Sequence, residues 1–231
     1  MTRAAILALV FAPAAAALAA PVPAESKVKD AYGAWADPDK DCEATARDGK
    51  LRIAIPAKPH SMNYNAAKYN APRLWREVEG DFTAVVRVGF PIPGGGGPFT
   101  ETNRWAYHGA GLIAWAGDDD HVRVLRQAHT SDKQLEEQFT LYLPYLGGKG
   151  GKMHTAVPLA EKTNHSAYLR VERRGDKVAT AFSYDKGDWQ SLGTATVGWG
   201  AKVKVGVVAE NNFNAPFEAT FDQYELTRPK K

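Results

Sequence analysis

The sequence predicts an all-β protein, a sandwich or jelly roll in which two antiparallel sheets pack face to face. Apolar and polar residues alternate with period two along nearly every segment after about residue 30, and Gly, Pro, Asn or Asp bounds each segment. No window keeps a helical period, apart from a short turn around Ser131–Glu137. Roughly ten to twelve strands with meander-like spacing then need two packed sheets to bury their apolar faces.

The predicted strands follow one another along the chain. In the run Arg73–Glu79, Leu74 and Val78 face one way while Trp75 and Glu77 face the other, so one face is buried. The strands expected from such alternation are Leu51–Pro56, Arg73–Glu79, Phe82–Phe90, His108–Ala116, His121–Gln127, Gln138–Leu143, Ala167–Arg173, Lys177–Tyr184, Lys202–Glu210 and Phe217–Leu226.

Turn signals separate these strands. The segments Arg173–Lys177 and Tyr184–Trp189 are typical of tight hairpin turns, and so is the acidic run Asp118–Asp120. The glycine runs Gly94–Gly97 and Gly147–Gly151 predict surface loops, because neither has the Lys-Ser/Thr pair and helix of a phosphate-binding loop.

The first 19 residues have the three parts of a secretory signal. Arg3 precedes the apolar run Ala4–Phe11, and the segment ends on the small residues around Leu18. We expect cleavage after Ala19, then a polar extension over residues 20–32 and a single sandwich domain over 33–228. A membrane anchor is disfavoured because Pro13 interrupts the run, and no later stretch approaches 18 apolar residues. The protein is then secreted or periplasmic, with no membrane span after cleavage.

Charge and cysteine content exclude several classes. The 231 residues carry 29 Lys and Arg against 26 Asp and Glu, a net charge of +3, or +2 once Arg3 is removed. This balance argues against a nucleic-acid partner. The single cysteine, Cys42, cannot form an internal disulfide, and its acidic neighbours disfavour a reactive thiolate. The six histidines lack zinc-site spacing, and no Gly-x-Ser-x-Gly elbow occurs.

Several blocks together resemble a known family. They resemble, in order, an uncharacterised bacterial domain family labelled regulation-of-enolase-like, within the concanavalin A-like lectin/glucanase superfamily. The blocks are Asn70–Leu74, Glu77–Phe82, Ala110–Trp115, Tyr168–Arg173, Val205–Glu210 and Pro216–Asp222. The resemblance covers about residues 33–226.

This resemblance implies a concanavalin A-like jelly-roll sandwich of two antiparallel sheets. It implies less about function, because the superfamily holds glycan binders, glycan hydrolases and modules of neither kind. The chain departs from the family pattern in an enlarged loop, Pro91–Tyr107, and in a long insertion around His129–Thr163. No catalytic residue is carried over from the family.

One acidic strand could supply the paired carboxyl groups of a glycoside hydrolase. Glu77, Glu79 and Asp81 would share a face if the strand stayed regular, and hydrolysis needs two carboxyl groups close together. Gly80 and Asp81 are typical of a turn, however, so a strand edge followed by a hairpin is the favoured interpretation. We keep hydrolysis as an alternative function.

A second acidic segment resembles the opening of a calcium loop. Asp37, Asp39 and Asp41 place oxygen ligands at every second position, as a hard cation prefers. The loop lacks the glycine and the closing glutamate of that motif, so a solvated acidic turn is favoured over a structural calcium site.

Aromatic residues on polar strand faces are the candidate binding residues. Sugar rings pack their C–H face on Trp or Tyr, while their hydroxyls need planar polar groups nearby. For each tryptophan, the alternative is that its side chain packs in the hydrophobic core. The candidate set is Trp75, Trp105, Tyr107, His108 and Trp115.

These observations favour an exported, non-catalytic β-sandwich module that binds carbohydrate or another extracellular surface. A secreted glycan hydrolase and a structural domain without a small ligand are the alternatives. The arrangement of the aromatic and acidic side chains on the folded strands discriminates among the three.

Overall fold

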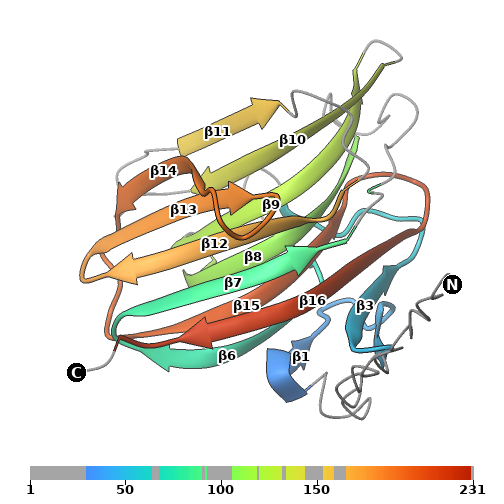
Figure 1. The fold of residues 1–231 in the computed structure, drawn as a ribbon. Coiled ribbons are helices and arrows are strands. Elements are labelled where there is room, and N and C mark those ends of the chain that lie inside the picture. Colours follow the sequence, from blue (N-terminus) through green and yellow to red (C-terminus); the bar gives the residue numbers. More distant parts are fainter. Residues whose placement is uncertain are drawn as a thin grey trace, which may run out of the picture.

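A computed structural model describes residues 30–63, 68–89, 92, 106–118, 120–131, 134–143, 153–158 and 165–229. These residues form two seven-stranded antiparallel sheets packed face to face, together with the two-stranded hairpin β4–β5 (Figure 1). The predicted fold class is confirmed. Apart from a helical turn at 30–32, the elements described are strands, and none of the described helical structure is long and apolar enough to cross a bilayer.

One sheet, here called the β8 sheet, has the order β1–β6–β15–β8–β9–β10–β11. Its strands are β1 (Ala34–Ala36), β6 (Arg73–Glu79), β15 (Lys202–Asn211), β8 (Tyr107–Gly117), β9 (Asp120–Ser131), β10 (Gln134–Leu143) and β11 (Met153–Pro158).

The other sheet, here called the β12 sheet, has the order β14–β13–β12–β7–β16–β3–β2. Its strands are β14 (Gln190–Thr196), β13 (Lys177–Ser183), β12 (Ala167–Arg174), β7 (Phe82–Val88), β16 (Phe217–Thr227), β3 (Lys50–Ile55) and β2 (Glu43–Arg47). The hairpin strands are β4 (Met62–Asn63) and β5 (Lys68–Tyr69).

The core lies between the two sheets and follows the predicted alternation. In β15, Val203, Val205 and Val207 belong to the core, while the residues between them face the other side of the sheet. Phe82 and Val86 of β7 contribute from the β12 sheet and are fully buried. Burial of these apolar faces therefore fixes which side chains lie on the outer face of each sheet.

The predicted hairpin turns occur where the sequence places them. Gly175 joins β12 to β13 with a φ of 59°, in the left-handed region that glycine adopts readily. Between β13 and β14, the carboxylate of Asp185 accepts hydrogen bonds from the backbone N–H of Gly187 and Asp188. Gly80 turns the chain between β6 and β7 with a φ of 77°.

The structure corrects several details. The helical turn expected around Ser131–Glu137 is wrong, because Ser131 ends β9 and Gln134 begins the adjacent β10. Part of the insertion around residues 129–163 forms β10 and β11, which extend one edge of the β8 sheet. The strands β1, β2, β4, β5, β11 and β14 were not expected. The signal segment and the runs Gly94–Gly97 and Gly147–Gly151 lie outside the described residues.

Gly206 is expected to tolerate no side chain. It pairs with Trp75 across β15 and β6, and a Cβ there would overlap the carbonyl oxygen of Leu74. We expect Gly206→Ala to lower the free energy of unfolding by about 2–3 kcal/mol, measured by urea denaturation. Gly200→Ala is the control, since no atom lies within 4 Å of its added Cβ. Equal stability of the two variants would contradict the close strand approach.

Candidate functional site

A second buried cluster lies on the outer face of the β8 sheet, the face turned away from the β12 sheet. Its members come from the centre of the sheet and from the region of the β4–β5 hairpin. The buried members are Met62, Ala71, Ile113, Trp115, Leu125 and Val208, with Tyr69 and Trp75 partly buried against them. An apolar cluster outside the main core gathers side chains where a ligand could approach.

Two predicted aromatic residues meet in this cluster. The ring centroids of Trp75 and Trp115 are 5.6 Å apart. His121, the cross-strand partner of Trp115, stacks on its ring at 4.9 Å, and Tyr69 of β5 packs edge-on against it at 5.9 Å. Trp115 is only 8% exposed, whereas Trp75 keeps an intermediate exposure. Trp75 is therefore the aromatic surface open to a partner, and Trp115 supports it.

A buried arginine lies against both tryptophans. The guanidinium carbon of Arg73 is 4.5 Å from the Trp75 ring and 5.1 Å from the Trp115 ring. Its Nη1 donates hydrogen bonds to the carbonyl oxygens of Ala71 at 2.7 Å and Tyr69 at 3.0 Å. Burial lowers the pKa of Arg73 to about 10, an effect that the charge of Asp118 opposes. The side chain is still a cation at neutral pH.

A second cation approaches Trp75 from the neighbouring strand. The ammonium of Lys204 in β15 lies 4.8 Å from the Trp75 ring centroid, and the residue is exposed. Both contacts have the distance of cation–π interactions.

A charged network lies farther along the same face. Arg123 of β9 donates to one carboxylate oxygen of Glu210 in β15, and the Tyr107 hydroxyl donates to the other at 2.6 Å. The Arg123 and Glu210 side chains are 4% and 0% exposed. Gly109 and Gly111 are outward residues of the intervening β8, so they leave the space that this pair spans. Burying two charges costs several kcal/mol per ion, which their mutual attraction only partly offsets, so the pair is weak evidence of stabilisation.

His121 is neutral in this environment. Its Nδ1 donates a hydrogen bond to the carbonyl oxygen of Asp118 at 3.0 Å, and its side chain is 1% exposed. Burial, and then the nearby charge of Arg123, hold the pKa of His121 well below its usual value of 6.5. Its Nε2 has no hydrogen-bond partner among the described residues.

The predicted binding residues divide between the two faces. Trp75, Tyr107 and Trp115 lie on the outer face and join the contacts above. His108 faces the core instead, where it stacks on Phe217 at 4.7 Å and is 1% exposed, so we remove it from the candidate site. Trp105 lies outside the described residues.

Five further outer-face residues belong to the site but were not among the predicted binding residues. They are Arg73, His121, Arg123, Lys204 and Glu210. The sequence shows on which face of its strand each of these residues lies. It does not show the strand order, which brings β6, β15, β8 and β9 side by side.

The acidic strand does not assemble a carboxylate pair. Glu77 is exposed and forms an ion pair with Lys202 at 3.0 Å. Asp81 lies beyond the turn at Gly80, where its carboxylate accepts a hydrogen bond from the backbone N–H of Gly175 at 2.8 Å. The geometry therefore gives no support to Glu77, Glu79 and Asp81 as catalytic residues.

Protein donors engage the carboxylates of the second acidic segment. Asp37 accepts from the backbone N–H of Lys40 and Cys42, and Asp39 accepts from Asn70. Asp41 lies 2.8 Å from His60 Nε2. Among the residues with described side chains, one cluster brings three potential metal ligands close together. It consists of Asp41, Cys42 and His60, and not of the three aspartates. Calcium binding there stays a prediction.

The structure indicates that Cys42 is protonated. Burial, followed by the charges of Asp37 and Asp41, raises the pKa of its thiol far above the usual range. A thiolate nucleophile at this position has no physical support.

Comparisons with known proteins agree on the fold. No protein-family model matches the chain, and no curated protein matches it. A functionally unknown protein from Saccharomyces cerevisiae has a TM-score of 0.63 and 20% identity, covering 87% of this chain and 98% of its own. A legume lectin-like domain from Entamoeba histolytica has a TM-score of 0.53 and 10% identity, covering 93% and 100%.

A glycoside hydrolase of family GH43 from Bacillus licheniformis, BlXynB, is similar over part of its length. The TM-score is 0.56 and the identity 16%, and the match covers 84% of this chain but 37% of the hydrolase chain. This chain is a jelly-roll sandwich of two antiparallel sheets. At these identities the comparisons establish the architecture, and function has to be argued from the site.

Removing the charge of Glu210 is expected to destabilise the protein strongly. Glu210→Gln would leave the buried guanidinium of Arg123 without its counter-ion, and we expect a loss of about 3–5 kcal/mol in urea denaturation. Glu77→Gln is the matched control, because its pair with Lys202 is exposed, and such pairs contribute about 0–1 kcal/mol. Similar losses in the two variants would contradict a desolvated Arg123–Glu210 pair.

His121 is expected to make stability fall in mild acid. Its pKa is depressed in the folded protein, so the unfolded chain binds the additional proton as the pH falls below 6.5. Stability should then decrease toward lower pH, by at most about 1.4 kcal/mol per pH unit for this one group. His121→Phe keeps the stack on Trp115 and should flatten the dependence between pH 7 and 5. An unchanged slope in that variant would contradict a buried neutral imidazole.

Proposed function

We propose that the protein is an exported, non-catalytic module that binds polysaccharide, or another extracellular surface, through the outer face of the β8 sheet. The observation that carries this proposal is the cluster in which Arg73 lies against Trp75 and Trp115. A sugar presents a C–H face to an aromatic ring and hydroxyl groups to charged or planar partners. The cluster offers both kinds of group on one face.

The residues of the site divide between contact and support. Trp75 and Tyr107 are partly exposed, so they make the direct contacts. Trp115 and the Arg123–Glu210 pair are buried, and they hold the contact residues in place. The Tyr107 hydroxyl is oriented by Glu210, which fixes the direction in which the ring is presented.

Hydrolysis is the less favoured function. It requires two carboxyl groups about 5–10 Å apart, one of them protonated. On the described part of this face, Glu210 already accepts hydrogen bonds from Arg123 and Tyr107, and Glu77 forms an ion pair with Lys202. A purely structural domain explains the main core, but it requires no partly exposed aromatic residue such as Trp75 on the outer face.

Export and family membership complete the proposal. The N-terminal signal would bring the module to the periplasm or the cell exterior, where polysaccharide is available. The ordered sequence blocks support membership in the regulation-of-enolase-like family, and the lectin-like architecture is compatible with that assignment.

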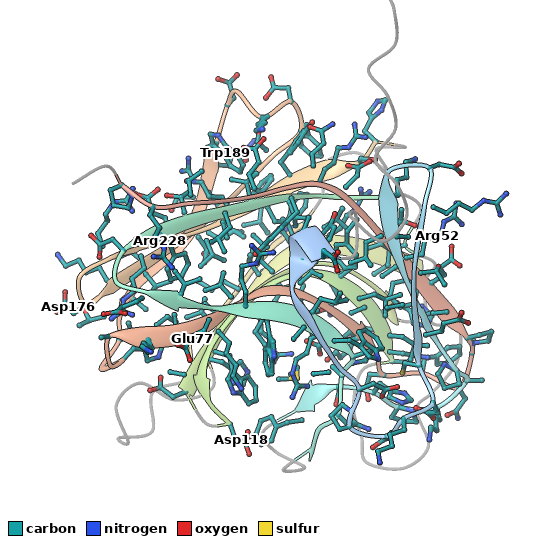
Figure 2. The ribbon with its side chains drawn as sticks, turned by 90° about the horizontal axis from the view of Figure 1, so that it is seen from below. Arg52, Glu77, Asp118, Asp176, Trp189 and Arg228 are labelled. Carbon is teal, nitrogen blue, oxygen red and sulfur yellow. The ribbon has the colours of Figure 1, made fainter. Side chains whose placement is uncertain are left out.

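A binding assay on insoluble polysaccharides and a glycan array tests this function. Stacking on one aromatic ring contributes about 1 kcal/mol beyond burial of area, so Trp75→Ala should weaken binding about five- to tenfold. Trp189→Ala is the matched control, because Trp189 also pairs with an arginine, Arg170 at 4.4 Å, but lies on the opposite side of the sandwich from Asp118 (Figure 2).

Two outcomes would reject the proposed site. Either the parent protein binds no polysaccharide, or Trp75→Ala binds as tightly as Trp189→Ala while both remain folded. Circular dichroism and urea denaturation of each variant supply the folding control.

A further inference from the structure

Two cations flank the proposed contact residue, and neither has an acidic partner among the described residues. Arg73 and Lys204 both lie within 5 Å of the Trp75 ring centroid. Arg73 hydrogen-bonds to backbone carbonyls and to the sulfur of Met62, and Lys204 forms no ion pair in the described structure. Asp118 acts on Arg73 only as a neighbouring charge, without a hydrogen bond.

The buried guanidinium is incompletely satisfied. Arg73 is 7% exposed, and its Nε has no hydrogen-bond partner in the described part of the chain. Burying a cation without a counter-ion is costly, and the depressed pKa of Arg73 reflects that cost. An anion bound close to Arg73 would offset it.

The ion pair of Lys202 takes up the carboxylate of the residue opposite Lys204, so Lys204 forms no ion pair among the described residues. Both lysines lie on the outer face of β15, and Glu77 is the direct cross-strand partner of Lys204. The Glu77 carboxylate nevertheless pairs with Lys202 at 3.0 Å, on the diagonal. Lys204 instead extends over Trp75, and it forms no ion pair with any residue that the structure describes.

The positive charge is local to Trp75. Farther along the face, Glu210 compensates Arg123 within the buried network. The whole chain is close to neutral at +3. Within the described part of the chain, two cations without a hydrogen-bonded acidic partner thus meet at one aromatic ring.

We propose that the site binds an anionic saccharide, a uronic acid residue whose ring packs on Trp75 and whose carboxylate is held by Lys204 and attracted by Arg73. This inference rests on the proposed carbohydrate-binding function. It adds the class of ligand, because a neutral sugar would leave both cations without a partner. The exposed Lys204 contacts the carboxylate, and the buried Arg73 contributes a fixed charge beside it.

The test compares acidic and neutral oligosaccharides of the same length on the whole protein. Oligogalacturonate is the acidic probe, its fully methyl-esterified form is the neutral match, and a sulfated galactan oligosaccharide is a second anion. By isothermal titration calorimetry we expect oligogalacturonate to bind at least tenfold more tightly than the ester at low salt. The difference should shrink as ionic strength rises, because Lys204 is exposed.

Two lysine variants locate the effect. Lys204→Gln should weaken oligogalacturonate binding about five- to tenfold and weaken binding of the ester much less, by about twofold at most. Lys177→Gln removes an equal charge from an exposed position in β13 of the β12 sheet, without releasing Glu77 beside Lys204, and it should change affinity less than twofold. Both residues are exposed, so both variants are expected to fold.

Each failure is distinguishable. Equal affinity for the acid and the ester would overturn the anionic ligand while leaving carbohydrate binding intact, whereas binding of neither would reject the proposed function itself. Preference for the sulfated probe alone would overturn the carboxylate assignment. Equal weakening by Lys204→Gln and Lys177→Gln would show that the anion responds to general surface charge and not to this site.

Discussion

Alternation along β15 is the constraint on which the rest of the molecule depends. This strand lies between β6 and β8, and its inward residues Val203, Val205 and Val207 are buried in the main core. The same alternation places Lys204 and Glu210 on the outer face. A slip of one residue would exchange the two sets, exposing valines and burying charges between the sheets. The core therefore positions the candidate site, because the hydrophobic energy that fixes the register also fixes every outward side chain.

Small residues decide how close the outward side chains can come. Gly206 stands opposite Trp75, so the indole ring has no side chain across from it on β15. Gly109 and Gly111 of β8 likewise place no side chain between Arg123 and Glu210, which belong to the strands on either side of β8. The outer face thus combines large polar and aromatic groups with glycines in the neighbouring rows. This combination can hold a desolvated ion pair and an aromatic–cation cluster on a single sheet.

Local patterns were sufficient for the fold class and for three residues of the site. The positions of Trp75, Tyr107 and Trp115 on one face follow from parity, which the sequence displays directly. The same parity argues against His108, since neighbours in a strand point to opposite faces, and this criterion could have removed it. The Arg123–Glu210 pair was not predictable, because residues 87 positions apart meet only through the order β15–β8–β9. The edge strand β1 has only three residues, too few to show an alternating pattern, and the alternation in β2 depends on two alanines alone.

The acidic N-terminal segment takes part in the site indirectly, by anchoring the chain that carries Arg73. Asp39 accepts from the Asn70 amide, and Asp41 pairs with Lys58 and His60. The His60 backbone in turn pairs with Asn211 at the end of β15. The carbonyls of Tyr69 and Ala71, which hold the Arg73 guanidinium, lie next to Asn70. Two of the three carboxylates with the spacing of a cation loop, those of Asp39 and Asp41, thus have their partners on the segment that leads to Arg73. The role of these carboxylates follows from the groups that they contact. Their spacing along the chain does not reveal those contacts.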